Sequence, residues 1–489
     1  MTTPPAYEDS HLSRWLRVRE FAVPPSMIET ATARRQAGDW AGACAAAHVD
    51  VDLDLRALAR SHGTELAARV RADLRRLAPD LLRWHMPRIA PDGLLRPGLT
   101  VALARYGTGG RDGSGPVHLV ARTAPAWADS GQRISLALRG RSPSGTGHGP
   151  AYAHPHPRPH PRFRLDLHRH LWDASRSGEL RTRSGASDPP PTGVPSPDLP
   201  EGGLRCAVGR WAEEAAILLR AEGRPAGPVA VRLGKGNRLL LDADPSWDSG
   251  PARAPSPVTL RSAPARRSSA TVPVLPDAAT WLPPDLELLR AGLVEAGGLH
   301  PLVAAALVPG HGPAGPHRPP DRAGAPRLVE CRGARHRIGL VDGVLTPLDH
   351  DPAELRREEL LVALTGTALP CVRAVDEAHR RPDCLTGVRE RLDHGDIAGA
   401  LAVVEGLLGP AALLRDGALR DVLEAAARRR VTYGLYRAGL VGPAPGRELA
   451  PPSPSSATRR TRPDSRRTRT RGAHPRHATS AFPSSSASR

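Results

Sequence analysis

The sequence predicts an α+β protein in which helical segments alternate with small antiparallel β-sheets. Residues 27–85 repeat apolar side chains at helical spacing, whereas residues 97–140 alternate apolar and polar side chains as strands do. Residues 327–444 read as a β-hairpin followed by a set of helices. Stretches rich in proline and glycine separate these regions, so we expect linkers between several folded units.

The N-terminal unit, residues 1–182, combines a helical segment with a small antiparallel β meander. Three period-two stretches within residues 97–140 predict the strands of the meander. The stretch FRLDLHRHLWD, residues 163–173, predicts a further strand, because its leucines alternate with polar residues. In the helical segment, four apolar residues spaced i, i+4, i+8 and i+11 form one face: Leu66, Val70, Leu74 and Leu77.

The middle of the chain predicts short elements separated by linkers. Residues 204–244 read as a helix and a β-hairpin with the turn Gly234-Lys235-Gly236-Asn237. Two short helices are expected in residues 281–308. Composition predicts linkers in three intervals: residues 183–203, 245–280 and 309–326.

The C-terminal unit, residues 327–444, carries clear local signals. Asp342-Gly343 suits the type I′ turn of a hairpin. Asp351 then caps a helix that has Pro352 at its first position and Glu354 at its third, as in a capping box. More helices follow. Residues 445–489 consist mostly of Pro, Ser, Thr and Arg with little to bury, which predicts disorder.

The six-residue phrase G-D-x-A-G-A occurs twice, beginning at Gly38 and at Gly395. A helix-like stretch precedes each glycine, which suits a left-handed position at the end of a helix, and Asp39 or Asp396 can cap the next helix. The phrase therefore predicts a compact helix hairpin. It resembles the middle of a tetratricopeptide unit, although no tandem array supports a solenoid. Two interpretations stay open: the phrase is a common way to form a helix hairpin, or it belongs to a helical surface that binds partners.

The C-terminal unit also carries a wider resemblance. The segments LVECRGARHRIGLVDGVLTPLDHDPAELRREELL, AVDEAHRRPDCL and GDIAGALAVVEGLLGP are similar to those of an uncharacterised protein family of high-GC bacteria. This resemblance covers most of the body outside the linkers and the tail. It implies a cytoplasmic accessory protein and brings no activity, cofactor or catalytic residue with it.

The net charge of +18 and the pI of about 11.0 suggest a polyanionic partner. Residues 451–489 alone hold nine arginines and one acid, and such a tail can bind phosphates without sequence preference. The other interpretation is an extension without function in a G/C-rich genome, because nearly every basic residue is Arg and only one, Lys235, is a lysine. The candidate nucleic-acid residues are Arg459, Arg460, Arg462, Arg466, Arg467, Arg469 and Arg471.

A metal site is the second candidate. If residues 163–173 form a strand, then Asp166, His168 and His170 share one face, and such ligands can hold zinc or iron. The alternative is the polar face of a half-buried strand whose leucines point to the core.

Other catalytic signals are weak. Asp376-Glu377-Ala378-His379 spells DEAH, but the sequence has no phosphate loop with a lysine, which excludes a helicase. A nucleophile elbow G-x-S-x-G does not occur. No C-x-x-C occurs either, so we expect no disulfide framework and no zinc ribbon, with Cys371 as a core residue. The five cysteines are Cys44, Cys206, Cys331, Cys371 and Cys384.

Three functions therefore stay open. The first is a non-enzymatic cytoplasmic scaffold or adaptor that binds an unknown protein partner through helical surfaces, without a cofactor. The second is a nucleic-acid-associated protein that uses the arginine-rich tail. The third is a metal-dependent enzyme centred on Asp166, His168 and His170. The sequence has neither an export signal nor a membrane-spanning run, so the cytoplasm is the expected location and no membrane contact is expected.

Overall fold

A computed structural model of the chain describes fifteen stretches of residues. The chain divides into the units Met1–Pro443 and Ala444–Arg489, and the second unit, with the predicted disordered tail, lies outside the described residues. The described stretches are 11–107, 115–128, 132–140, 154–186, 205–234, 237–243, 259–263, 272–311, 327–331, 333–341, 344–351, 353–357, 370–371, 387–408 and 416–441.

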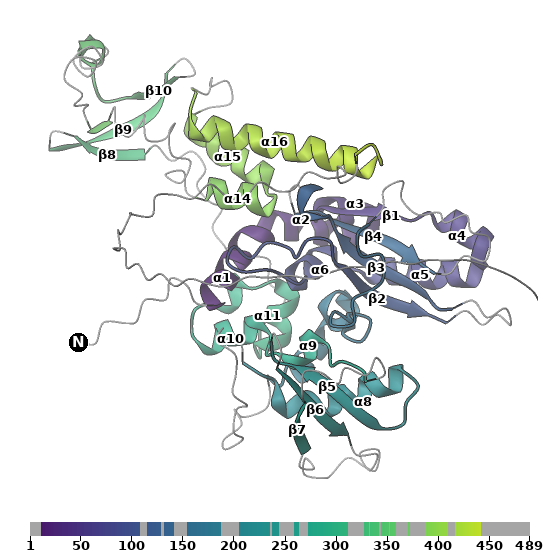
Figure 1. Ribbon diagram of the computed structural model, residues 1–489. Helices are drawn as coiled ribbons and strands as arrows, with labels where there is room; N and C mark the ends of the chain where they lie inside the picture. Colours follow the sequence, from purple (N-terminus) through teal and green to yellow (C-terminus); the bar gives the residue numbers. More distant parts are fainter. Residues whose placement is uncertain are drawn as a thin grey trace, which may run out of the picture. The chain divides into compact units, whose positions relative to one another are not determined.

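The α+β prediction is confirmed, beginning with the N-terminal helices (Figure 1). All four residues of the predicted helix face, Leu66, Val70, Leu74 and Leu77, are buried, and Leu77 lies just after the end of the helix Thr64–Arg76. One short strand interrupts the helices, because the alternating sequence VDVD spans only β1. The elements are α1 His11–Arg17, the π-helix Val18–Ala22, α2 Pro25–Gln36, α3 Trp40–Ala46, β1 Val49–Asp52, α4 Leu55–His62, α5 Thr64–Arg76 and α6 Pro79–His85.

The predicted meander exists as β2 Thr100–Tyr106, β3 Val117–Thr123 and β4 Ile134–Arg139. The sheet has the order β1-β4-β3-β2, with β1 added parallel to β4. The helices and this sheet share one hydrophobic core, in which Leu74, Leu103 and Leu119 are fully buried. Replacing such a leucine by alanine typically costs about 2–5 kcal/mol.

The strand predicted for residues 163–173 does not form. These residues make turns, a short 3₁₀ helix at Arg169–Leu171 and two isolated bridges, one between Arg164 and Ala102 and one between Asp173 and Leu77. Trp172 explains the departure, because its buried indole donates a hydrogen bond back to the carbonyl of Leu165 at 3.0 Å and curls the segment on itself. A second 3₁₀ helix, Ala174–Glu179, and α7, Leu180–Arg183, follow.

A second sheet forms the middle of the chain. Helix α8, Trp211–Ala221, packs with the hairpin of β5, Gly227–Arg232, and β6, Arg238–Ala243, as predicted. The interval 245–280, expected to be a linker, contributes β7, Thr259–Ala263, and α9, Asp277–Thr280. Strand β7 pairs with β6 because the central strand of a sheet offers hydrogen bonds on both edges.

Residues 281–308 do not stand apart as a separate unit. Helix α10, Pro284–Arg290, and helix α11, Pro301–Leu307, are the two predicted short helices. Val303 and Leu307 of α11 belong to the same buried core as the N-terminal helices and sheet. Composition could not predict this, because the contact joins segments more than two hundred positions apart.

The predicted C-terminal hairpin is part of a three-stranded antiparallel sheet of order β10-β9-β8. Asp351 caps the helical residues 353–357, and its Oδ1 accepts a hydrogen bond from the Ala353 amide at 3.0 Å. The elements of this region are β8 Arg327–Cys331, β9 Ala334–Val341, β10 Val344–Pro347, α14 Val388–His394, α15 Ile397–Leu408 and α16 Ala418–Arg437.

The repeated phrase forms the same helix hairpin at both places, as predicted. Gly38 and Gly395 have φ angles of +78° and +88°, in the left-handed region that favours glycine. The Asp39 carboxylate then accepts a hydrogen bond from the Gly42 amide at 2.8 Å, and the Asp396 carboxylate accepts one from the Gly399 amide at 2.9 Å. The phrase thus encodes a left-handed helix end followed by an aspartate cap.

The second glycine of the phrase gives a stability prediction. A Cβ atom on Gly399 would lie 2.1 Å from Asp396 Oδ2, so Gly399→Ala must displace the cap and should cost about 1–2 kcal/mol, as lost N-caps do. Gly434→Ala in α16 is the matched control, because nothing described beyond the adjacent residues and the local helix backbone lies within 4 Å of the added methyl group, and it should stabilise by up to about 1 kcal/mol. Thermal unfolding of both variants measures this, and equal effects would contradict the cap.

Candidate metal centre

Two cysteines and two histidines converge beside the β8–β10 sheet. They are Cys331, His336, His350 and Cys371, and one ligand atom from each lies within 4.8 Å of the ligand atoms of the other three. Cys331 ends β8, His336 lies on β9, His350 follows β10, and Cys371 belongs to the helical residues 370–371. Four separate places in the chain thus supply one donor each.

The register of the sheet positions the first two donors. Cys331 pairs with Ala334 across a two-residue turn in which Gly333 has a φ of +80°. Val329 pairs with His336, and side chains two apart on a strand share a face, so Val329, Cys331 and His336 project to the same side. Val329 packs on the sulfur-bearing side chains there.

A local clamp positions His350. The Asp349 carboxylate accepts hydrogen bonds from the Arg337 amide at 2.6 Å and from its guanidinium at 2.8 Å. The Arg337 guanidinium, with the hydrogen bond from its amide, lowers the pKa of Asp349 to about 2, so the carboxylate is charged at neutral pH. This holds the chain after β10 against β9. The His350 ring then lies against His336, with 4.2 Å between ring centroids and 2.6 Å between His350 Nε2 and His336 Nδ1.

Cys371 completes the set. Its Sγ lies 3.8 Å from His336 Nδ1, and both Cys371 and Cys331 are buried. Burial and, to a smaller extent, the neighbouring Cys331 raise the pKa of the Cys371 thiol to about 12. The thiol is therefore protonated at neutral pH without a metal, and a bound cation would displace its proton.

The separations suit a tetrahedral ion. Zinc with Zn–S bonds of about 2.3 Å and Zn–N bonds of about 2.0–2.1 Å holds its ligand atoms roughly 3.3–3.8 Å apart. The 3.8 Å between Cys371 and His336 lies at this limit, and the two ring nitrogens need to separate by roughly 0.7 Å from 2.6 Å. Two thiolates with two imidazoles are the donor set of structural zinc.

An outer partner also fits a metal ligand. His350 would bind through Nε2, and its Nδ1 points to Glu354, whose Oε2 lies 3.7 Å away. Metal-bound imidazoles commonly face a carboxylate through the other ring nitrogen, which fixes the tautomer and orients the ring. Glu354 is positioned by the helical turn that Asp351 caps.

The structure gives the predicted triad other partners. Arg164 binds the Asp166 carboxylate with both its Nε and Nη2 at 2.9 Å. His168 lies 3.2 Å from Glu214 through Nε2 and 3.0 Å from the Arg164 carbonyl through Nδ1. His170 is buried, its Nδ1 has no hydrogen-bond partner, and its ring centroid lies 5.8 Å from that of His168. Within the described residues, the one group identified as able to hold a metal is the Cys331/His336/His350/Cys371 set.

The remaining candidates cannot be placed. The DEAH segment, residues 376–379, and Cys384 lie outside the described residues. So do the seven predicted nucleic-acid residues: Arg459, Arg460, Arg462, Arg466, Arg467, Arg469 and Arg471.

Sequence reasoning missed the four donors for an identifiable reason. A zinc ribbon is expected when cysteines occur in C-x-x-C pairs, and here each donor stands alone. The available signal was the predicted β-strand region itself. Its three strands bring together Cys331 at the end of the first strand, His336 on the second and His350 after the third. Cys371 was interpreted as a core residue, and it is buried as a core residue would be.

No family model, curated protein or solved structure matches the chain.

Proposed function

We propose that this protein is a zinc-stabilised, non-enzymatic adaptor that works in the cytoplasm. The observation that carries the proposal is the convergence of two thiols and two imidazoles within 4.8 Å from four places in the chain. The fold brings two buried thiols and two half-buried imidazoles to one point, and buried polar side chains need partners.

The donor set supports a structural ion and not a catalytic one. Four protein ligands fill a tetrahedral zinc and leave no position for water or substrate, whereas catalytic zinc has three protein ligands and an open position. Both cysteines are buried. Zinc bound here would join β8, β9, the segment after β10 and the helix that carries Cys371.

The C-terminal helices supply the proposed partner surface. Helix α15 contacts β9 and β10, so the zinc-bearing sheet and the helices support each other. On α16, Val431 and Leu435 are spaced i, i+4 and are 63% and 38% exposed, and Leu440 just beyond it is 73% exposed. An exposed apolar row on a helix is the feature through which a partner helix or groove binds.

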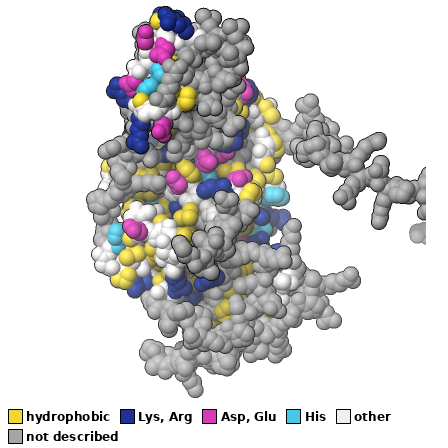
Figure 2. Space-filling model, turned by 90° about the vertical axis from the view of Figure 1, so that its left-hand side faces the viewer, with side chains coloured by type: hydrophobic (Ala, Val, Ile, Leu, Met, Phe, Trp, Pro, Cys, Tyr) yellow, Lys and Arg dark blue, Asp and Glu magenta, His cyan; other side chains and the backbone are white. Residues whose placement is uncertain are grey.

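Nucleic-acid binding through the arginine-rich tail is the alternative. Figure 2 shows basic and acidic side chains interspersed on the described part of one face. This part of the surface is therefore not uniformly basic. Such binding would have to depend on the tail. Phosphate contacts weaken steeply with salt, so capture that vanishes at high salt or in a chain ending at Ala444 would favour this alternative.

Metal analysis of the purified full-length protein tests the zinc. We expect one zinc per chain in the unmodified protein and in Cys206→Ser, a half-buried cysteine outside the site. Cys331→Ser and Cys371→Ser should each lower the zinc content at least about 10-fold at equal protein concentration, since a thiolate ligand is lost. Zinc that persists in the double cysteine variant but is lost from His170→Gln would overturn the proposal in favour of the Asp166, His168 and His170 site.

A further inference from the structure

A cleft of about 430 Å³ lies among residues of the N-terminal helices, the first sheet and α8. It is formed by α5, the end of β2, the segment 164–169 and the end of α8. Five arginines and two aspartates lie in its wall, and Glu222 and Asp173 also pair with these arginines, so one positive charge is in excess. The arginines are Arg69, Arg76, Arg105, Arg164 and Arg169.

Asp73 fixes one side of the cleft. Its buried carboxylate accepts hydrogen bonds from Arg76 at 2.6 Å, from Arg169 at 2.5 Å and from the Tyr106 hydroxyl at 2.7 Å. The Arg169 guanidinium also lies 4.5 Å from the centroid of the Trp172 ring, which restricts its rotation. Two guanidinium groups are therefore held in place before any ligand arrives.

Asp166 and Glu222 fix the opposite side. Arg164 donates two hydrogen bonds to Asp166 at 2.9 Å and one to Glu222 at 2.7 Å. These partners raise the pKa of Arg164, so its charge is permanent. Asp166 thus holds the Arg164 guanidinium in place in the wall of the cleft.

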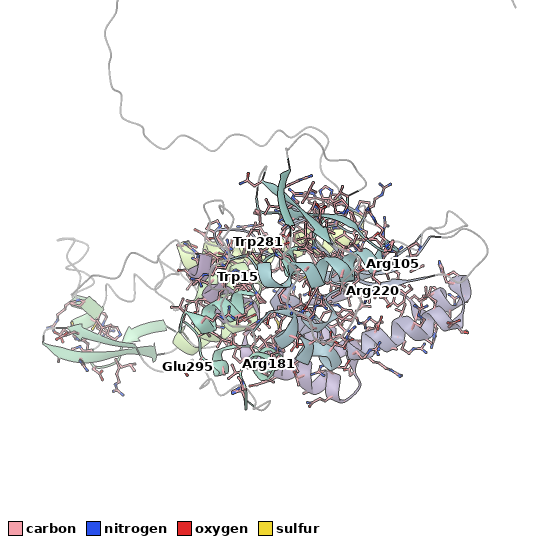
Figure 3. All side chains as sticks on the ribbon, turned by 90° about the horizontal axis from the view of Figure 1, so that it is seen from below. Trp15, Arg105, Arg181, Arg220, Trp281 and Glu295 are labelled. Carbon is pink, nitrogen blue, oxygen red and sulfur yellow. The ribbon has the colours of Figure 1, made fainter. Side chains whose placement is uncertain are left out.

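Two arginines at the rim differ from the other three. Arg69 is exposed and lies over the Tyr106 ring at 5.4 Å, and no carboxylate within the described residues pairs with it. Arg105 is exposed and donates only a long hydrogen bond, 3.4 Å, to the Ala221 carbonyl at the end of α8. Figure 3 shows Arg105 near Arg220 of that helix. These two guanidinium groups have donors to spare for an anion.

We infer that this cleft binds a small molecule through a phosphate group. Guanidinium groups match phosphate oxygens with paired hydrogen bonds, and the two exposed arginines at the rim can bind a phosphate beside the fixed ones. The volume lies within the usual range of about 300–1,000 Å³ for small-molecule sites. Ala72, Ala104 and Leu167 add apolar wall on which the rest of such a molecule can lie.

Calorimetric titration of the full-length protein with inorganic pyrophosphate tests the inference. We expect saturable binding whose affinity weakens at least about 10-fold in the Arg69→Ala/Arg105→Ala variant. Each charge-assisted hydrogen bond that is lost should raise the dissociation constant by about a factor of 10. Arg56→Ala/Arg60→Ala is the matched control, since it removes the same charge from exposed positions on the neighbouring helix α4 and should leave the affinity within about 2-fold.

Two results would overturn the inference. One is the absence of saturable pyrophosphate binding. The other is an equal loss of affinity in both double variants, which would show a general effect of net charge. Neither result bears on the zinc, because no residue of the cleft belongs to the metal centre.

Discussion

Chelation of zinc is expected to unfold the β8–β10 sheet while the N-terminal core stays folded. The three strands contain five, eight and four residues. A sheet of this size is marginal without additional support, and structural zinc contributes on the order of 10–16 kcal/mol in small zinc-dependent folds. The buried apolar residues of the N-terminal core include none of the metal ligands.

Hydrogen exchange monitored by mass spectrometry measures this directly. With a zinc chelator, peptides from residues 327–351 should lose most of their protection, and readdition of zinc should restore it. Peptides from β2, β3 and β4 are the internal control and should not change. Cys371→Ser should reproduce the effect without a chelator. Equal protection of residues 327–351 with and without chelator would mean that the four side chains do not hold the sheet.

The second large effect is expected at the buried ion pair between Arg19 and Asp285. The Asp285 carboxylate is fully buried, and Arg19 reaches it with Nε at 2.7 Å and Nη2 at 2.9 Å. Trp84 donates its indole N–H to the same carboxylate at 3.2 Å. Asp285→Asn leaves the guanidinium buried without its charge partner, which should cost about 3–5 kcal/mol.

Chemical unfolding followed by tryptophan fluorescence measures this loss, since Trp84 lies in the network. Asp416→Asn is the control, because Asp416 is 94% exposed and pairs with Arg420 at the surface, where such pairs contribute up to about 1 kcal/mol. If Asp285→Asn lowers the free energy of unfolding no more than Asp416→Asn does, then the Arg19–Asp285 pair does not hold α10 to the N-terminal helices.

Local patterns predicted the elements well where one physical signal dominated. The period-two stretches became β2, β3 and β4, and the Asp351 cap and the repeated G-D-x-A-G-A phrase formed as expected. Residues 163–173 failed because alternation of leucines does not require a strand when a residue such as Trp172 can close a turn. Strand β7 was missed because five residues within a Pro- and Ser-rich interval carry too little pattern.

The sequence did not predict contacts between residues that lie far apart along the chain. Helix α16 is tied to β1 through hydrogen bonds from Tyr433 to Asp50 and from Arg437 to Asp52, and no local signal points to either pair. The metal centre has the same character. His336 and Cys371 are 35 positions apart and come together only through the tertiary fold. The spacing of the donors along the chain therefore did not predict that they would meet.

Among the described residues, no helix is both long and apolar enough to span a bilayer.

X-ray absorption at the zinc edge of the full-length protein tests the central proposal most directly. The account predicts one zinc with two sulfur ligands at about 2.3 Å and two nitrogen ligands at about 2.0–2.1 Å. Loss of one sulfur in Cys331→Ser, with no change in Cys206→Ser, would assign the ligands. Zinc surrounded only by nitrogen and oxygen ligands, or no zinc at all in protein purified with zinc present, would contradict it.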